Sequence, residues 1–83
     1  MIEILLFARL REQVGVSRMS YEPASLPVTV DALIAELRNL GDEWKTALGE
    51  DNLLCAVNQH QASRAHRIAT GDEVAFFPPV TGG

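Results

Sequence analysis

Apolar and polar positions alternate near both ends of the chain. Between Ile2 and Phe7, the side chains of Ile2, Ile4 and Leu6 fall on one side of an extended strand, because successive residues of a strand point to opposite faces. Near the carboxyl terminus, Val74 and Phe76 alternate in the same way. The two stretches therefore predict the first and last strands of a sheet, each with one face toward a core.

The positions between these core residues are also largely apolar. They include Leu5 and Phe7 on the first strand, and Ala75 and Phe77 on the last. If the two strands are neighbours, Phe7 and Phe77 form an exposed aromatic patch. Such a patch usually marks a partner surface. The alternative is a second, minor cluster under the loops.

One amphipathic helix is predicted over residues 30–40. Thr29 provides an N-cap and Gly41 a stop. A single apolar stripe of this kind is enough to cover one face of a sheet. The stripe recurs at steps of three and four residues and consists of Val30, Leu33, Ile34, Leu37 and Leu40.

Weaker patterns complete the predicted order of elements, which is strand, strand, helix, strand, short strand, strand. This order indicates an α+β fold, in which a mixed sheet packs on one main helix. Residues 1–77 then form the domain and residues 78–83 an extended tail. The weaker elements are a short helix at 8–14 ended by Gly15, strands at 17–22 and 53–58, a second short helix at 42–48, a turn at Asn58-Gln59, and a short strand near Gln61.

Composition excludes several function classes. The 83 residues carry a net charge of −4, and a chain with one lysine lacks the cationic stripe of a nucleic-acid-binding protein. No stretch has the length of a membrane span or the pattern of a signal peptide. A single cysteine, Cys55, cannot form an internal disulfide. We therefore expect a cytoplasmic protein without nucleic-acid or membrane contacts.

Few side chains suggest chemistry. Cys55 lies in an apolar strand and is expected to be a buried small hydrophobe rather than a nucleophile. His60 and His66 lack the cysteine or acidic partners of a metal site, so we expect surface histidines and no metal. Arg9 and Arg11 fit a solvated helix face, or alternatively a contact with an anion or a partner.

The carboxyl-terminal tail is the stretch most suggestive of function. Pro78 and Pro79 cannot donate to a sheet and favour an extended exit from it. Gly82 and Gly83 have no side chains and can thread a narrow channel. The terminal carboxylate of Gly83 could be activated as an acyl-adenylate and then attacked by a sulfur or nitrogen nucleophile. The alternative is a frayed end without function.

Three stretches are similar to a known family. They are Leu6-Phe7-Ala8-Arg9-Leu10-Arg11-Glu12, Ala56-Val57-Asn58-Gln59 and, most specific of all, the sequence from Gly71 to Gly83 that includes Phe76-Phe77-Pro78-Pro79-Val80-Thr81-Gly82-Gly83. Over essentially its whole length, the chain resembles the small, sulfur-carrier subunits of molybdopterin synthase. The resemblance implies a ubiquitin-like β-grasp fold with a flexible Gly-Gly tail.

The resemblance also implies a function. In that family an activating enzyme uses ATP to adenylate the terminal glycine, and a sulfurtransferase relay converts it to a thiocarboxylate. The tail then enters the large subunit of a heterotetramer and donates sulfur to cyclic pyranopterin monophosphate. The small subunit binds no cofactor of its own, and the catalytic side chains reside on the large subunit.

Site residues follow from the matched positions. The resemblance implies that Gly83 is the sulfur carrier, that Gly82 and Thr81 thread the tail, and that Phe7, Phe77 and Arg11 contact partners. Family members often have an apolar residue where this chain has Gln61, which reduces the expected patch. Two alternatives use the same tail chemistry: a sulfur carrier for thiamin or tRNA thiolation, and a ubiquitin-like modifier that forms amide bonds with lysines.

Overall fold

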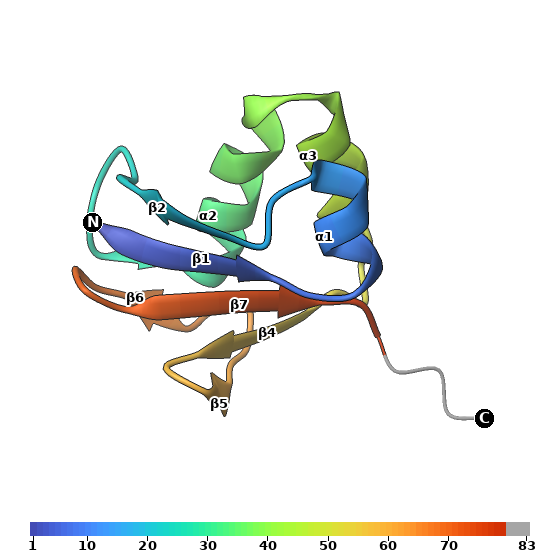
Figure 1. Ribbon diagram of the computed structural model, residues 1–83. Coiled ribbons are helices and arrows are strands. Elements are labelled where there is room, and N and C mark those ends of the chain that lie inside the picture. The colour runs from blue at the N-terminus through green and yellow to red at the C-terminus, as the bar shows by residue number, and fades with distance from the viewer. Residues whose placement is uncertain (80–83) are drawn as a thin grey trace.

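A computed structural model of the chain describes residues 1–79. Figure 1 shows a sheet with helices above it. The elements in chain order are β1 (Ile2–Leu6), α1 (Arg9–Val14), β2 (Arg18–Tyr21), β3 (Val28–Thr29), α2 (Val30–Leu37), a 3-10 turn (Arg38–Leu40), α3 (Asp42–Ala47), β4 (Leu54–Val57), β5 (His60–Gln61), β6 (Arg67–Ile68) and β7 (Glu73–Phe77). Every helix and strand predicted from the sequence is present, with shifted ends.

The main sheet has the strand order β2-β1-β7-β4-β5, so the first and last strands are neighbours at its centre. β1 and β7 are parallel, with Leu5 opposite Ala75 and Leu6 opposite Phe76. The other pairs are antiparallel. A parallel pair needs a long crossover connection, and here the crossover carries α2 and α3. The arrangement confirms the predicted α+β class.

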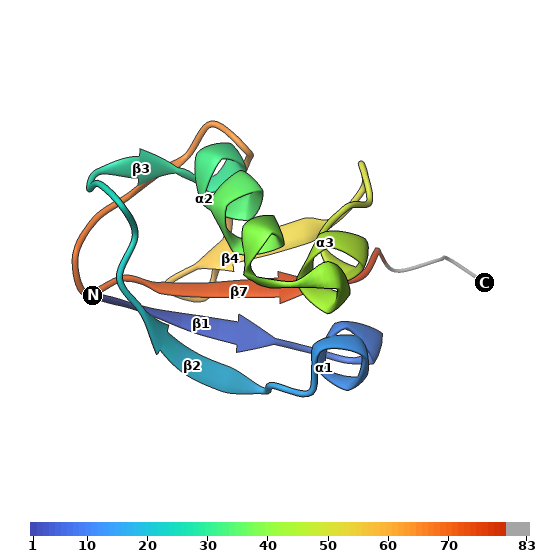
Figure 2. The ribbon, with the colours of Figure 1, turned by 90° about the horizontal axis from the view of Figure 1, so that it is seen from above.

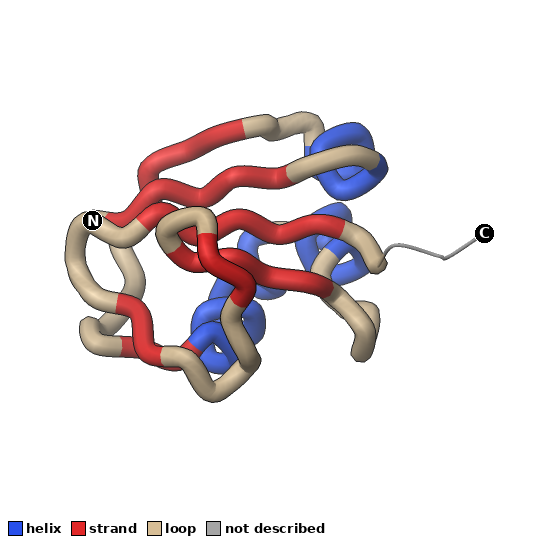
Figure 3. Tube along the Cα trace, turned by 90° about the horizontal axis from the view of Figure 1, so that it is seen from below, coloured by secondary structure: helices blue, strands red, loops and turns tan. Residues whose placement is uncertain are grey.

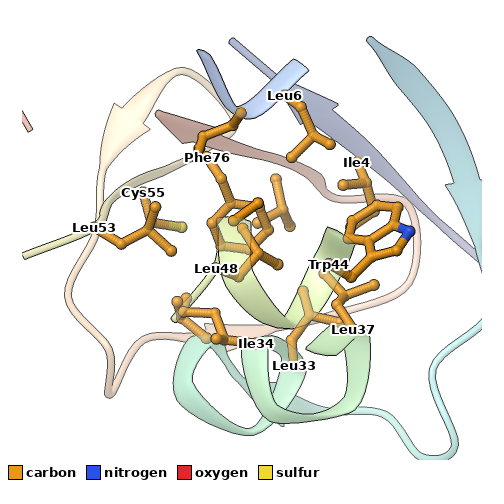
Figure 4. Close-up of a cluster of buried hydrophobic side chains, with 14 of the residues drawn as sticks. Ile4, Leu6, Leu33, Ile34, Leu37, Trp44, Leu48, Leu53, Cys55 and Phe76 are labelled. Carbon is orange, nitrogen blue, oxygen red and sulfur yellow. The ribbon is translucent and has the colours of Figure 1, made fainter. Parts of the chain in front are cut away.

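All three α-helices lie on one side of the sheet, as Figures 1 and 2 show from the side and from above. The core fills the space between the two layers (Figure 4). Phe76 from β7 and Leu33 from α2 are both 0% exposed. Trp44 is buried in the same cluster. The alternation of β1 and β7 is confirmed, because Ile2, Ile4, Leu6, Val74 and Phe76 are all buried.

Helix α2 begins as predicted but ends earlier. The Thr29 hydroxyl accepts a hydrogen bond from the Ala32 amide at 3.1 Å, which confirms the N-cap. The helix stops at Leu37 and continues as a 3-10 turn. Leu40, predicted to be part of the buried stripe, is 47% exposed. The 3.6-residue period no longer applies in a 3-10 turn, so the periodicity predicted one position too many.

A second, two-stranded sheet was not predicted. Val28 of β3 lies opposite Ile68 of β6, and Ile68 is 0% exposed. The amide of Val30 donates to the His66 carbonyl at 2.9 Å, which ties the start of α2 to the same segment. Strands of two residues show no alternation, so this sheet left no periodic signal in the sequence.

Candidate functional site

The sheet face opposite the helices carries an apolar surface. Figure 3 shows this face from below, with the helices behind the strands or beyond their ends. The strand pairing aligns Leu5, Ala75 and Ala56 in one row across the sheet, and Phe77 with Leu54 in the next. We call this surface the open-face patch. It consists of Leu5, Phe7, Leu54, Ala56, Ala75 and Phe77, each half-buried or exposed.

The two aromatic residues of the open-face patch are in contact. The rings of Phe7 and Phe77 lie edge to face, with centroids 6.5 Å apart and planes at 75°. The Phe7 amide donates to the Phe76 carbonyl at 3.2 Å, which holds Phe7 beside the end of β7. Phe7 nevertheless remains 46% exposed. The prediction that these rings lie together is confirmed, with Phe7 exposed and Phe77 half-buried.

Leu54 and Ala56 are patch residues that the sequence analysis did not single out. The signal was present, because Leu53, Cys55 and Val57 point into the core and the residues between them must point outward. Only the pairing of β4 with β7 places them beside Phe77. Gln61 of β5 lies opposite Ala56 of β4 and gives the patch a polar edge.

The other end of the open face is polar. Glu3 lies opposite Ser20 and Glu73 on the neighbouring strands. Its carboxylate accepts a hydrogen bond from the Ser20 hydroxyl at 3.0 Å and pairs with Arg18 at 3.4 Å. The patch is therefore confined to the end of the sheet at which β7 leaves the fold.

A network of hydrogen bonds fixes the turn that begins at Asn58. Its side-chain amide donates to the Asp72 carboxylate at 3.0 Å, and its side-chain oxygen accepts from the Glu73 amide at 3.0 Å. The Ala69 amide also donates to Asp72, at 2.8 Å. The two bonds that Asp72 accepts, from Ala69 first and then from Asn58, lower its pKa below the usual value. The network fixes the register of β4 against β7 at the polar end of the open face.

Of the remaining predicted site residues, Arg11 lies within the described part of the chain and Thr81, Gly82 and Gly83 do not. Arg11 is exposed on α1, while Arg9 forms an ion pair with Glu50. Thr81, Gly82 and Gly83 lie outside the described residues, so their roles stay predictions. The division into a domain of residues 1–77 and a tail of residues 78–83 also stays a prediction.

Cys55 and the two histidines lie where the sequence predicted. Cys55 is buried, and desolvation raises the pKa of its thiol to about 11. His60 and His66 are exposed. Within residues 1–79 there is no group of three or more His, Cys, Asp or Glu side chains that could hold a metal ion, and no pocket. No helix in this part of the chain has the length and apolar character to cross a bilayer.

Comparisons with known proteins connect this surface to a family. The model of the ThiS family matches residues 4–83. A protein of Escherichia coli (strain K12) named molybdopterin synthase sulfur carrier subunit is 48% identical over 83 residues, which is 100% of both chains. A protein of the same name from Haemophilus influenzae is 41% identical over 83 residues, again 100% of both chains.

A solved structure agrees with the fold. The crystal structure of SAMP1 from Haloferax volcanii superposes with a TM-score of 0.80 at 30% identity, and the alignment covers 99% of this chain and 98% of that one. The shared architecture confirms the ubiquitin-like β-grasp fold that the sequence resemblance implied.

Proposed function

Because the chain belongs to the ThiS family, we propose that it is the sulfur-carrier subunit of a molybdopterin synthase. The observation that carries the proposal is the match, over all 83 residues, to relatives of that name at 48% and 41% identity. The open-face patch supports it independently, because an apolar surface at the end of β7 can hold a partner next to the tail.

The proposed chemistry takes place at the carboxylate of Gly83. An activating enzyme transfers AMP from ATP to this carboxylate and releases pyrophosphate. Hydrosulfide supplied by a sulfurtransferase then attacks the acyl carbon, a carbon–sulfur bond forms, and AMP leaves with the electrons of the broken carbon–oxygen bond. The product is a thiocarboxylate, which donates sulfur to cyclic pyranopterin monophosphate in the active site of the large subunit.

The single cysteine supports a carrier role for the chain end rather than for a side chain. Thiolates, not thiols, are the nucleophiles of sulfur chemistry. Cys55 is buried, and its pKa of about 11 keeps it protonated at neutral pH. Sulfur held by this protein is therefore expected on Gly83, where Gly82 and Thr81 can enter a narrow channel.

The open-face patch is the proposed docking surface for the large subunit. Phe7 and Phe77 provide aromatic anchors of the kind that dominate binding energy at interfaces. Arg11 is proposed as a polar contact on the adjacent helix α1. We also propose that the activating enzyme binds the chain, that the assembly is a heterotetramer, and that it works in the cytoplasm.

The test is to attach sulfur to the full-length protein and detect it by mass spectrometry. The chain is incubated with ATP, the activating enzyme and a sulfide source, and its intact mass is measured. A mass increase equal to the difference between one sulfur and one oxygen is expected. The charged protein should then support molybdopterin formation by the large subunit. An unchanged mass under conditions that charge the Escherichia coli relative would contradict the proposal.

Two variants of the chain end provide the controls. Removal of Gly83, or one extra residue after it, should abolish sulfur transfer without changing the thermal unfolding midpoint, because the acyl carbon is displaced by a whole residue from its reactive position. Full activity of the extended chain would exclude Gly83 as the carrier. Intact-mass measurement on the protein isolated from cells distinguishes a protein modifier, since conjugates to lysines would add the mass of whole proteins.

A further inference from the structure

The chain leaves the fold between two segments that are distant in sequence. Strand β7 lies between β1 and β4 in the main sheet. Helix α1 follows β1, and residues 49–53 lead into β4. These two segments therefore flank the point at which Pro78 follows β7. Figure 2 shows β7 running toward the end of the molecule where α1 and α3 lie on either side.

One ion pair joins the two flanking segments. Arg9, the first residue of α1, pairs with Glu50. The two side chains are 46% and 39% exposed. An ion pair this open to water contributes little to folding stability. It does connect α1 to residues 49–53 across the end of β7, and no local sequence pattern indicates this contact.

The backbone of residues 49–53 is also held in place, by hydrogen bonds from Arg64. The Arg64 guanidinium donates to the carbonyls of Glu50 at 3.1 Å and Asp51 at 3.4 Å. The same guanidinium pairs with Asp31 at 3.1 Å. Because Arg64 binds the Glu50 backbone, the Glu50 side chain is not needed to hold its own segment in place. It is therefore available to fix the position of α1.

We propose that the Arg9–Glu50 pair is a positioning device for the carboxyl-terminal tail. It keeps α1 and residues 49–53 at a fixed separation and thereby sets the direction in which the chain leaves β7. This inference rests on the proposed function, since direction matters only if the tail must reach a partner's active site. Neither residue reacts, and both act through the tail.

The physical reason is that a reacting end must be presented in a narrow range of orientations. Misplacement of a reactive group by about 1 Å can cost a large part of the rate. Docking through the open-face patch does not depend on the ion pair, because five of its six residues lie on strands and Phe7 is held by the Phe76 carbonyl. Arg11 is the one proposed docking contact on α1. Loss of the pair should therefore lower turnover more than it weakens the binding of the large subunit.

The test compares full-length variants in reconstituted molybdopterin synthase. Glu50→Gln and Arg9→Gln each remove the ion pair. The double variant Arg9→Glu with Glu50→Arg restores it with reversed charges. Glu3→Gln is the matched control, because Glu3 is 38% exposed and pairs with Arg18 at the polar end of the open face. Turnover at saturation, the dissociation constant for the large subunit and the thermal midpoint are measured.

The single variants are expected to lower turnover about two- to fivefold, the size that one exposed ion pair allows. The dissociation constant should change less than the turnover, the thermal midpoint should not change, and the double variant should regain the original turnover. The Glu3→Gln control should match the unaltered chain.

Three results would overturn the positioning role. They are full turnover by Glu50→Gln, failure of the reversed pair to restore the rate, and an equal loss in the Glu3→Gln control. Failure of the reversed pair would mean that each residue contacts the partner directly. If the unaltered chain itself transfers no sulfur in the same assay, the proposed function fails first, and the positioning role with it.

Discussion

The two faces of the central strands differ in burial far more than in composition. On β7, Val74 and Phe76 are 0% exposed, whereas Ala75 and Phe77 are only half-buried. All four residues are apolar, and they alternate along the same strand. The helices account for the difference, because they cover one face and leave the other open.

This difference separates residues that hold the fold together from residues that the fold does not need. Complete burial of a phenylalanine side chain is worth roughly 1.5–3 kcal/mol. On the covered face the folded chain already gains that free energy. On the open face part of it remains available to a binding partner. An apolar side chain without a role in the core is therefore evidence for an interface.

The largest expected effect is on the covered face. Phe76→Ala should lower the free energy of unfolding by about 3–5 kcal/mol, because it leaves a cavity in a closely packed core. That is a large part of the roughly 5–15 kcal/mol that stabilises a typical domain. Urea denaturation followed by circular dichroism measures it. A loss below about 1 kcal/mol would mean that the two faces do not differ as described.

A smaller effect, of a different kind, is expected on the open face. Phe77→Ala should weaken binding of the large subunit about tenfold or more, as loss of an aromatic anchor does. Its effect on unfolding should be about 1 kcal/mol or less, because the side chain is only half-buried. Titration calorimetry and urea denaturation measure the two quantities.

Leu40 provides the matched control for Phe77. It is also apolar, and at 47% it is more exposed than Phe77, but it lies in the 3-10 turn away from the open-face patch. Leu40→Ala should leave the affinity for the large subunit unchanged. If both variants bind as well as the unaltered chain, the open-face patch is not the docking surface.

The smallest expected effect is at the polar end of the open face. Hydrogen bonds from the Ala69 amide and the Asn58 side chain lower the pKa of Asp72. A lowered pKa in the folded state means that the ionised carboxylate stabilises the fold. This contribution is complete above the unfolded-state pKa of about 3.9 and is lost as the pH falls through the lower folded-state value.

Asp72→Asn tests this dependence on pH. The substitution should cost about 1 kcal/mol at neutral pH, and the difference from the unaltered chain should shrink below about pH 4. Urea denaturation at a series of pH values measures it. A difference that stays constant down to the acid limit would show that the charge of Asp72 does not stabilise the fold.

Much of the fold was predictable because its signals are local. The alternation of Ile2, Ile4 and Leu6 identified the covered face of β1, and the cap at Thr29 identified the start of α2. The prediction was wrong at Leu40, where a 3-10 turn replaced the expected end of the helix. It missed β3 and β6, whose two-residue strands show no periodicity.

The candidate site was predictable only in part. The aromatic pair followed from alternation once β1 and β7 were assumed to be neighbours. The contributions of Leu54 and Ala56 depended on the pairing of β4 with β7. The contact of Arg9 with Glu50 joins residues 41 positions apart, and nothing in either local sequence indicates it.

The sequence by itself determined which residues share a face of each strand and where the main helix begins. It also determined that some apolar residues of the strands would not face the core. These properties follow from the fixed geometry of a strand or helix over a few residues. Only the tertiary structure decided which of these apolar residues contact one another and which charged side chains connect distant segments. Those contacts depend on strand order and register, which are set by the packing of the whole chain rather than by any short stretch of it.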